Sequence, residues 1–240
     1  MNKMLDKNLL KQSYGERFEE SLRIPELSLD NVKPSRDYFE INSLVSKQFI
    51  PKKLHTYCVV AGVPFDSDTI EFINKCCSKI RHVLDDSDVY FVKPQNLGLE
   101  LLVIKWPNDN LQVDTLKQMK TFLAGLSNID IQIKIEGFQF HSDGCIVLRG
   151  YDSQGDFQKI RQQAITKIPN LPKKQSSWCH IPIGRILSPV HHLEYCKLKD
   201  LAQISFDSWH HSFIIQNLKL LDERRWYQED KILLFQRNFN

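Results

Sequence analysis

Two short segments of the sequence carry residue types that could transfer protons or hold a charged ligand. The first reads Leu-Gly98-Leu-Glu100-Leu, and the second reads Cys-His180-Ile-Pro182-Ile-Gly-Arg185. An imidazole with a pKa of about 6.5 can take or give a proton at neutral pH, and a glutamate whose pKa is raised by burial can do the same. Acid–base chemistry or the binding of an anion is therefore the chemistry that these segments could support.

Both segments alternate in the way that β-strands do. With a period of two, Gly98 and Glu100 share one face of the first strand, and leucines occupy the other face. In the second strand, His180 and Pro182 share a face that lies opposite an apolar row ending in Arg185. If the two strands face each other as a pseudo-two-fold pair, these glycine, glutamate, histidine and proline residues are presented to one shared cleft.

The surrounding sequence predicts the elements that position these residues. Strands are predicted over 57–64, 97–106, 129–136, 144–150, 178–187, 212–221 and 231–239, and helices over 70–83, 113–126, 156–168 and 190–202. Short apolar or alternating runs predict the strands, and apolar residues three and four positions apart predict the helices. The third and fourth strands are expected to pair as a hairpin. Because strand–helix–strand units recur in the two halves, we expect an α+β protein built by internal duplication.

Residues 1–54 differ in composition and hydrophobic pattern from the rest of the chain. Charged and polar residues dominate there, the apolar residues hold no long period, and three prolines interrupt the stretch. Because the residue before a proline is biased away from the helical conformation, a modest helix over 3–22 followed by extended chain is predicted. We expect an N-terminal extension, 1–54, that either wraps around the main domain, 55–240, or contacts a partner protein.

The composition limits the class of protein. Of the 240 residues, 42% are hydrophobic and 25% are charged, and the net charge is only +3. That balance excludes a histone-like mode of nucleic-acid binding but permits a local basic patch. No apolar stretch approaches the roughly 18 residues of a membrane span, and the start lacks the pattern of a signal peptide. The six cysteines form no CxxC pair and most have apolar neighbours, so we expect buried thiols in a cytoplasmic protein without membrane contact.

The order of the elements, and above all the run Trp178-Cys-His-Ile-Pro-Ile-Gly-Arg-Ile186, resembles the two-histidine (2H), LigT-like phosphoesterase superfamily over about residues 55–240. Members carry one His-x-Thr/Ser motif on each of two facing strands, and Gly-Arg often follows the second motif, as it does here. The resemblance implies a duplicated, two-lobed α+β fold with mostly antiparallel sheets and flanking helices. It also implies that two histidines act as general base and general acid on a 2′,3′-cyclic phosphate or a similar phosphodiester.

This sequence departs from the family pattern at three of the four motif positions. The first histidine falls on Gly98 and its hydroxyl partner on Glu100, whereas the second histidine falls on His180 and its partner on Pro182. A carboxylate about 4 Å from a phosphate would repel it by about 4 kcal/mol at an effective dielectric constant of about 20. The proline lacks both a hydroxyl and a backbone donor. We therefore expect an eroded site that binds a nucleotide, an RNA end or another phosphorylated ligand without the usual hydrolysis.

Further interpretations stay open beside this one. In the first, the protein is an active phosphodiesterase in which Glu100, with a pKa raised by burial, replaces the missing acid or base beside His180. In the second, the N-terminal segment fills the cleft and the protein only assembles with partners. For a binding protein, the expected ligand contacts besides the histidine are Gly98, Pro182, Arg185 and Lys174, the last on a loop expected at the rim of the cleft.

The remaining polar motifs do not predict a metal or a cofactor. Two vicinal histidine pairs, 191–192 and 210–211, cannot chelate one ion without help, because neighbours point about 100° apart on a helix and to opposite faces on a strand. The sequence also contains no glycine-rich phosphate loop and no nucleophile elbow. Stacking surfaces for a nucleobase could come from Trp178, Trp209, Trp226 and Tyr227, and a basic rim from residues that include Arg161 and Lys173.

Overall fold

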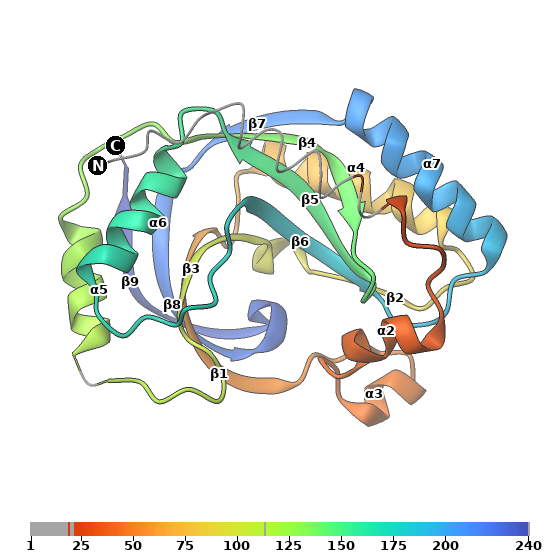
Figure 1. The fold of residues 1–240 in the computed structure, drawn as a ribbon, viewed down its shortest axis with the longest axis horizontal. Helices are drawn as coiled ribbons and strands as arrows, with labels where there is room; N and C mark the ends of the chain where they lie inside the picture. The colour runs from red at the N-terminus through yellow and green to blue at the C-terminus, as the bar shows by residue number, and fades with distance from the viewer. Residues whose placement is uncertain (1–18, 20–21, 113, 240) are drawn as a thin grey trace.

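The described residues of this computed structural model, 19, 22–112 and 114–239, form two antiparallel sheets with helices outside them (Figure 1). The strand order of the first sheet is β3 (Gly98–Lys105), β1 (Lys53–Gly62), β8 (Asn217–Arg225) and β9 (Asp230–Asn238). The order of the second is β2 (Val89–Phe91), β6 (Cys179–Ile186), β5 (Cys145–Asp152), β4 (Gln132–Phe140) and β7 (His210–Ile214). The predicted hairpin is confirmed, because β4 and β5 pair directly.

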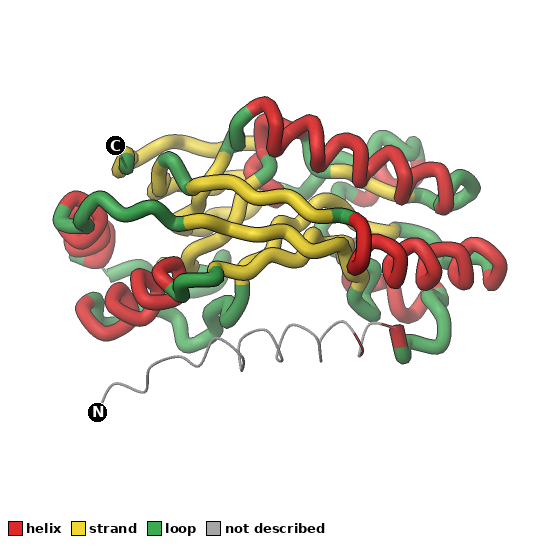
Figure 2. The backbone as a smooth tube through the Cα atoms, turned by 90° about the horizontal axis from the view of Figure 1, so that it is seen from above, coloured by secondary structure: helices red, strands yellow, loops and turns green. Residues whose placement is uncertain are grey.

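Four longer helices flank the sheets (Figures 1 and 2). The helices α4 (Ser67–Val83) and α7 (His192–Ser208) pack together over the second sheet, whereas α5 (Thr115–Ala124) and α6 (Asp156–Lys167) lie on the side of the first. At the start of α4, the Asp66 side chain accepts a hydrogen bond of 2.8 Å from the backbone N–H of Thr69. The buried residues of α4 then recur at helical spacing, which confirms the predicted amphipathic helix.

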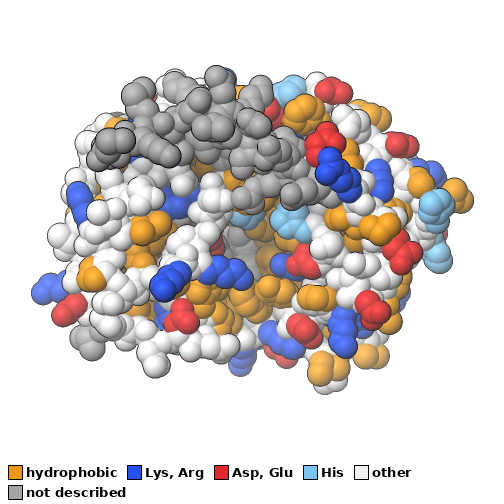
Figure 3. Space-filling view, in the orientation of Figure 1, with side chains coloured by type: hydrophobic (Ala, Val, Ile, Leu, Met, Phe, Trp, Pro, Cys, Tyr) orange, Lys and Arg blue, Asp and Glu red, His pale blue; other side chains and the backbone are white. Residues whose placement is uncertain are grey.

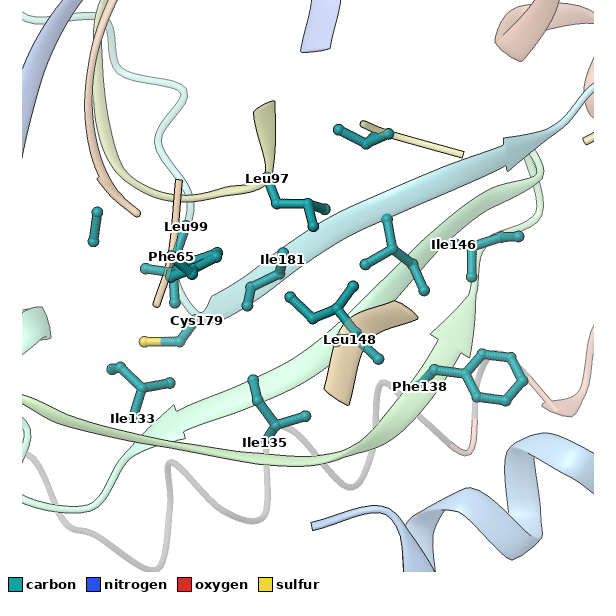
Figure 4. Close-up of a cluster of buried hydrophobic side chains, with 14 of the residues drawn as sticks. Phe65, Leu97, Leu99, Ile133, Ile135, Phe138, Ile146, Leu148, Cys179 and Ile181 are labelled. Carbon is teal, nitrogen blue, oxygen red and sulfur yellow. The ribbon is translucent and has the colours of Figure 1, made fainter. Parts of the chain in front are cut away.

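One large apolar cluster joins the two sheets and the four helices (Figure 4). In the close-up, Leu99 of β3, Ile181 of β6 and Leu148 of β5 lie within one cluster, and all three are fully buried. Burying a side chain of this size contributes roughly 1.5–3 kcal/mol. The core faces of β3 and β6 are therefore fixed, and the opposite faces of these strands are left to form a cleft.

The tail of the chain differs from its prediction. The segment predicted as one strand over 212–221 forms two strands, β7 in the second sheet and β8 in the first. The chain crosses between the sheets at Ile215, which is buried and donates its N–H to the carbonyl of Ile131 at 2.9 Å. A continuous apolar run cannot reveal this crossing, since both strands and the link between them contribute to the same core.

The described part of the N-terminal stretch is not extended chain. It contains the helices α2 (Leu29–Arg36) and α3 (Ile41–Val45), so that part of the prediction is wrong. The helix α2 forms despite Pro34, because Ser28 and Asn31 cap its first turn and Val32 is fully buried. The predicted helix over 3–22 lies almost entirely outside the described residues.

Two further points complete the fold. The short strand β2 has no counterpart in the sequence prediction, because three residues are too few to show a period. None of the helices among the described residues is both long and apolar enough to cross a membrane.

Candidate functional site

A cleft of about 330 Å³ opens where β3 of the first sheet packs against β6 of the second. The six residues that the sequence predicts for the site all line it: Gly98, Glu100, Lys174, His180, Pro182 and Arg185. Figure 3 shows a hollow near the centre of this face, with histidine side chains at its upper rim and Lys or Arg side chains on both sides. The structure thus brings these residues together, and their environments decide what each can do.

The His180 ring is held in a stack on the wall of the cleft. Its centroid lies 4.5 Å from that of Trp178, and the two planes are within 17° of parallel. On the same indole, the ring of His141 lies at a centroid distance of 6.2 Å, and His141 also lines the cleft. Because Trp178 is buried, the stack fixes the plane of the His180 imidazole relative to the cleft.

Gly98 faces the cleft at a place with little room for a side chain. A Cβ atom there would lie 2.8 Å from Cγ2 of Val63 and 3.3 Å from Nε2 of Gln228. The first distance is shorter than real Cβ contacts, so Val63 would have to move before any other residue could occupy this position. The structure therefore closes the position at which the family resemblance expects the first histidine.

Two carboxyl groups occupy the wall of the cleft formed by the first sheet. Glu100 comes from β3 and Glu223 from β8, and both line the cavity. Burial raises the pKa of each group, to about 7 for Glu223, where the nearby Glu100 charge acts in the same direction. The Glu223 carboxylate accepts a 3.0 Å hydrogen bond from the N–H of Gln228 and faces the Cys58 thiol at 3.9 Å. This wall consequently holds a proton near neutral pH.

Bulges decide which residues face the cleft. Between β1 and β3, Val59 pairs with Leu102 and Val60 with Glu100, so Leu101 is an extra residue. The strict alternation predicted for β3 therefore stops there, and Leu102 lies in the core rather than on the cleft face. Between β5 and β6, Ile183 is the extra residue in the same way. It turns Arg185 onto the cleft face, whereas the sequence places Arg185 on the apolar face.

Arg185 is engaged by protein groups on several sides. Its Nη1 donates to Oδ2 of Asp143 at 2.8 Å and to Oγ of Ser35 at 2.7 Å, and its Nε donates to the Tyr227 hydroxyl. The guanidinium also lies 4.1 Å from the ring centroid of Tyr38. The Asp143 carboxylate offsets much of its charge, and the same pairing lowers the pKa of Asp143. Arg185 thus joins the N-terminal stretch to the end of the cleft.

Pro182 and Lys174 complete the predicted set. The strand β2 pairs only with residues 184–186 of β6. Pro182 lies outside this paired segment, so its lack of a backbone N–H removes no hydrogen bond between β2 and β6. Lys174 is exposed at the mouth, where its carbonyl accepts a 3.2 Å hydrogen bond from the Trp106 indole. Its Nζ lies 5.5 Å from the Trp106 ring centroid, so a cation and an aromatic face adjoin at the entrance.

Two residues expected at the surface of the site lie elsewhere. Arg161 is 1% exposed on α6 and donates to the backbone carbonyls of Glu100 at 3.0 Å and Leu101 at 2.5 Å. Arg161 is therefore a buried residue that hydrogen-bonds the backbone of β3, and it is not part of a basic rim around the cleft. Trp209 packs in the core, stacked on Phe138 at a centroid distance of 5.3 Å, and offers no face to a ligand.

Other features of the described residues are less suited to chemistry. A larger groove of about 730 Å³ lies between α5 and α6, but the described residues that line it include no histidine or cysteine, and Asp114 is their single carboxylate. No group of three or more metal-ligating side chains is found in the part of the chain that the structure describes. The His211 ring bonds the buried Thr69 hydroxyl at 2.9 Å and stacks on Phe72. We assign the candidate site to the smaller cleft.

Comparisons with known proteins agree with this architecture. No protein-family model and no curated protein matches the chain. Escherichia coli LigT complexed with NADP+ superposes with a TM-score of 0.55 at 10% identity, covering 79% of this chain and 99% of LigT. The same protein complexed with 3′-AMP gives a TM-score of 0.52 at 11% identity, with 79% and 99% covered. The Thermus thermophilus protein TT0787 gives 0.54 at 10% identity, with 77% and 97% covered. The chain has the LigT-like fold.

The LigT-like fold confirms the prediction of a duplicated, two-lobed α+β architecture. It also explains why the sequence misses part of the cleft. The cleft is completed by residues from segments that are distant along the chain: Tyr38, His141, Asp143, Glu223 and Gln228. Trp226 and Tyr227, which the sequence suggests as stacking surfaces, also line it. The sequence reads 222–227 as a link between strands, whereas β8 continues to Arg225 and directs Glu223 into the cleft. No local period marks these positions.

Proposed function

We propose that this protein binds a nucleotide, an RNA end or another phosphorylated ligand in the cleft and does not hydrolyse it by the two-histidine reaction. The observation that carries the proposal is the closed position at Gly98, where Val63 lies 2.8 Å from the place of a Cβ atom. One imidazole cannot take a proton from the nucleophile and give another to the leaving oxygen in the same step. The other histidine that lines the cleft, His141, comes from the same sheet as His180 and lies over the same Trp178 indole, so the facing strand β3 presents no imidazole. The site is therefore suited to binding more than to this catalysis.

The ligand class is supported by two kinds of observation. One protein of the same fold, Escherichia coli LigT, is found complexed with NADP+ and with 3′-AMP, both of which carry a phosphate on a nucleoside. In this chain, His180 on the wall and Lys174 with Trp106 at the mouth supply a donor, a cation and an aromatic face. A phosphate next to a base can use all three, because a cation attracts the phosphate and a base stacks on an indole.

The decisive experiment compares turnover with binding. We expect no hydrolysis of 2′,3′-cyclic nucleotides or short 2′,5′-linked oligonucleotides above the level of the His180→Ala variant. We also expect calorimetry to detect binding of 3′-AMP that weakens about tenfold in His180→Ala, since a hydrogen bond to a charged group contributes roughly 1.5–3 kcal/mol. His192→Ala, an exposed histidine on α7, is the matched control. Turnover that depends on His180 would overturn the non-catalytic part, and absence of binding would overturn the ligand.

A second candidate function is an altered phosphodiesterase. The specific observation in its favour is the pair of carboxyl groups, half-buried Glu100 and buried Glu223, in the same cleft as His180. Burial raises the pKa of both groups, to about 7 for Glu223. In that reaction, neutral His180 takes the proton of the attacking water. A protonated carboxyl then gives its proton to the ribose oxygen that leaves phosphorus, so the proton count balances.

The two candidates predict different outcomes for the same variant. If the carboxyl group is the acid, Glu100→Gln removes the donor and lowers turnover at least a hundredfold while 3′-AMP still binds. If the protein only binds, the wild-type chain has no turnover to lose, and the variant differs from it only in its affinity for 3′-AMP.

The N-terminal stretch and the location of the protein are also proposals. We propose that residues 1–54 are an extension to a 55–240 domain, since solved structures of this fold leave 21% of the chain uncovered and 1–54 is a similar share. The described part packs on the domain through Leu27, Val32 and Phe39, whereas Ile41 and Val45 of α3 are exposed apolar side chains that a partner protein could contact. The six cysteines are all unpaired thiols, which supports a reducing cytoplasmic location.

A further inference from the structure

The two walls of the cleft have opposite chemical character. The wall from the first sheet carries Glu100 and Glu223, with Cys58 between their strands on β1. Among the described residues, no salt bridge reaches either carboxylate; the amine of Lys231 bonds the side chain of Asn96 at 2.6 Å instead. The opposite wall carries His180, and Lys174 stands at the mouth.

This asymmetry limits where a phosphate can lie. Arg185 lies on the same wall as His180 and pairs with Asp143 at 2.8 Å. Because this carboxylate offsets most of its charge, the guanidinium does not offset the negative charge of Glu100 and Glu223 on the opposite wall. A phosphate against Glu100 and Glu223 would face two acceptors and no cation, which is repulsive. A phosphate beside His180, within reach of Lys174 at the mouth, avoids that cost. The groups bonded to the phosphate then point toward the carboxyl groups.

We propose that Glu100 and Glu223 accept hydrogen bonds from a ribose hydroxyl next to the phosphate of the ligand, so that the cleft selects ribonucleotides over deoxyribonucleotides. This inference rests on the proposed function, since it requires a phosphorylated ligand beside His180. In a nucleoside 3′-phosphate, the 2′-hydroxyl is on the carbon adjacent to the phosphate-bearing one, so both groups span one narrow cleft. Ionised carboxylates only accept hydrogen bonds, and the 2′-hydroxyl is the donor that distinguishes RNA from DNA.

The cost of these carboxyl groups supports a role in recognition. Glu223 is only 8% exposed, and its oxygens meet one backbone N–H and one weakly donating thiol. Burial disfavours the ionised form of this group, which forms no salt bridge among the described residues, and its pKa therefore rises to about 7 although the charge of Lys231 acts in the opposite direction. A ligand hydroxyl that donates into this wall supplies the hydrogen bond that the ionised form needs.

The test uses the full chain and two commercial ligands that differ in one oxygen. Calorimetry measures binding of 3′-AMP and of 2′-deoxyadenosine 3′-monophosphate at pH 8. We expect the deoxy ligand to bind about ten- to a hundredfold more weakly, which is the effect of losing a hydrogen bond to a charged group. Equal affinities would overturn this inference and leave the proposed function intact. Binding of neither ligand would overturn the proposed function, and the inference with it.

Variants then separate recognition from a structural role. In Glu100→Ala and Glu223→Gln, we expect the preference for 3′-AMP to fall at least fivefold because 3′-AMP binds more weakly, whereas the affinity of the deoxy ligand, which makes no hydrogen bond to these groups, changes little. A structural role alone would weaken both ligands together, which would contradict the assignment. Glu229→Gln is the matched control, since Glu229 lies in the same hairpin but bonds Tyr90 and Lys93 at 2.8 and 2.7 Å outside the cleft. The wild-type comparison holds even if a variant does not fold.

Discussion

Glu223 shows how strongly burial can change the pKa of a carboxyl group. It follows Asp222 in β8, and the two neighbours point to opposite faces of the first sheet. Asp222 meets His55 at 3.3 Å and Arg224 at 3.1 Å, whereas Glu223 meets only Gln228 and Cys58. Burial therefore raises the pKa of Glu223 to about 7. The native state holds a proton that the unfolded chain has already released.

Glu223→Gln tests this linkage through stability. Between the unfolded pKa of about 4.5 and the folded value of about 7, the native state binds more protons, so wild-type stability falls as pH rises through that window. The loss amounts to on the order of 3 kcal/mol above pH 7. The glutamine variant has no such loss, so its free energy of unfolding relative to wild type should increase between pH 5 and pH 8 in urea titrations. A pH-independent difference would contradict the raised pKa.

At the scale of elements, the packing of β3 against β6 determines the cleft. The bulge at Leu101 ends the alternation of β3. The Arg161 guanidinium donates hydrogen bonds to the backbone carbonyls of Leu101 and Glu100. The same guanidinium reaches the carbonyl of Trp178 at 3.4 Å, immediately before β6. Arg161 therefore ties together the two strands that carry Glu100 and His180, although it belongs to a helix that follows neither of them directly.

Arg161→Met should cost about 3–5 kcal/mol in the free energy of unfolding. The substitution removes hydrogen bonds from three backbone carbonyls in or next to β3 and β6, and buried polar groups left without partners are expensive. Arg161→Lys, which keeps a charge but not the fork of donors, should cost less. Lys159→Met on the same helix is the control, because Lys159 is 58% exposed and pairs only with Asp156. A similar loss in both methionine variants would show that helix α6, not the tie, is responsible.

At the scale of the molecule, the N-terminal stretch closes one end of the cleft. Phe39 is fully buried, with its ring 5.0 Å from Tyr90 and 6.1 Å from Tyr227 in centroid distance. Tyr38 lines the cleft itself and meets the Trp226 ring at 4.7 Å. Segments near both ends of the chain thus form one aromatic cluster, and its order determines where Arg185 and Tyr227 stand.

Phe39→Ala should destabilise the whole protein by about 3–5 kcal/mol, as expected for removal of a large buried aromatic side chain. It should also weaken 3′-AMP binding, because Tyr227 loses a packing partner beside the cleft. Ile41→Ala, two residues away and 71% exposed, should change the free energy of unfolding by no more than about 0.5 kcal/mol. Equal stability of the two variants, measured by urea unfolding, would mean that the stretch is not part of the core.

Much of the fold could be predicted because its signals are local. The amphipathic spacing of α4 and the alternation of β4 appear within windows of ten to twenty residues, and the structure has both elements. The same local alternation placed Gly98, Glu100 and His180 on faces that meet in one cleft. The short strand β2 and the break between β7 and β8 could not be predicted, because they depend on which sheet completes each pairing.

By itself, the sequence determined the α+β class, the duplicated order of elements and the strand faces that carry Gly98, Glu100 and His180, since residue type and period act within one strand or helix. Only the tertiary structure decided that a bulge at Ile183 turns Arg185 into the cleft and that Val63 closes the position at Gly98. It also decided that Glu223 joins Glu100 on one wall. These outcomes depend on contacts between residues far apart along the chain, and such contacts leave no period in the sequence.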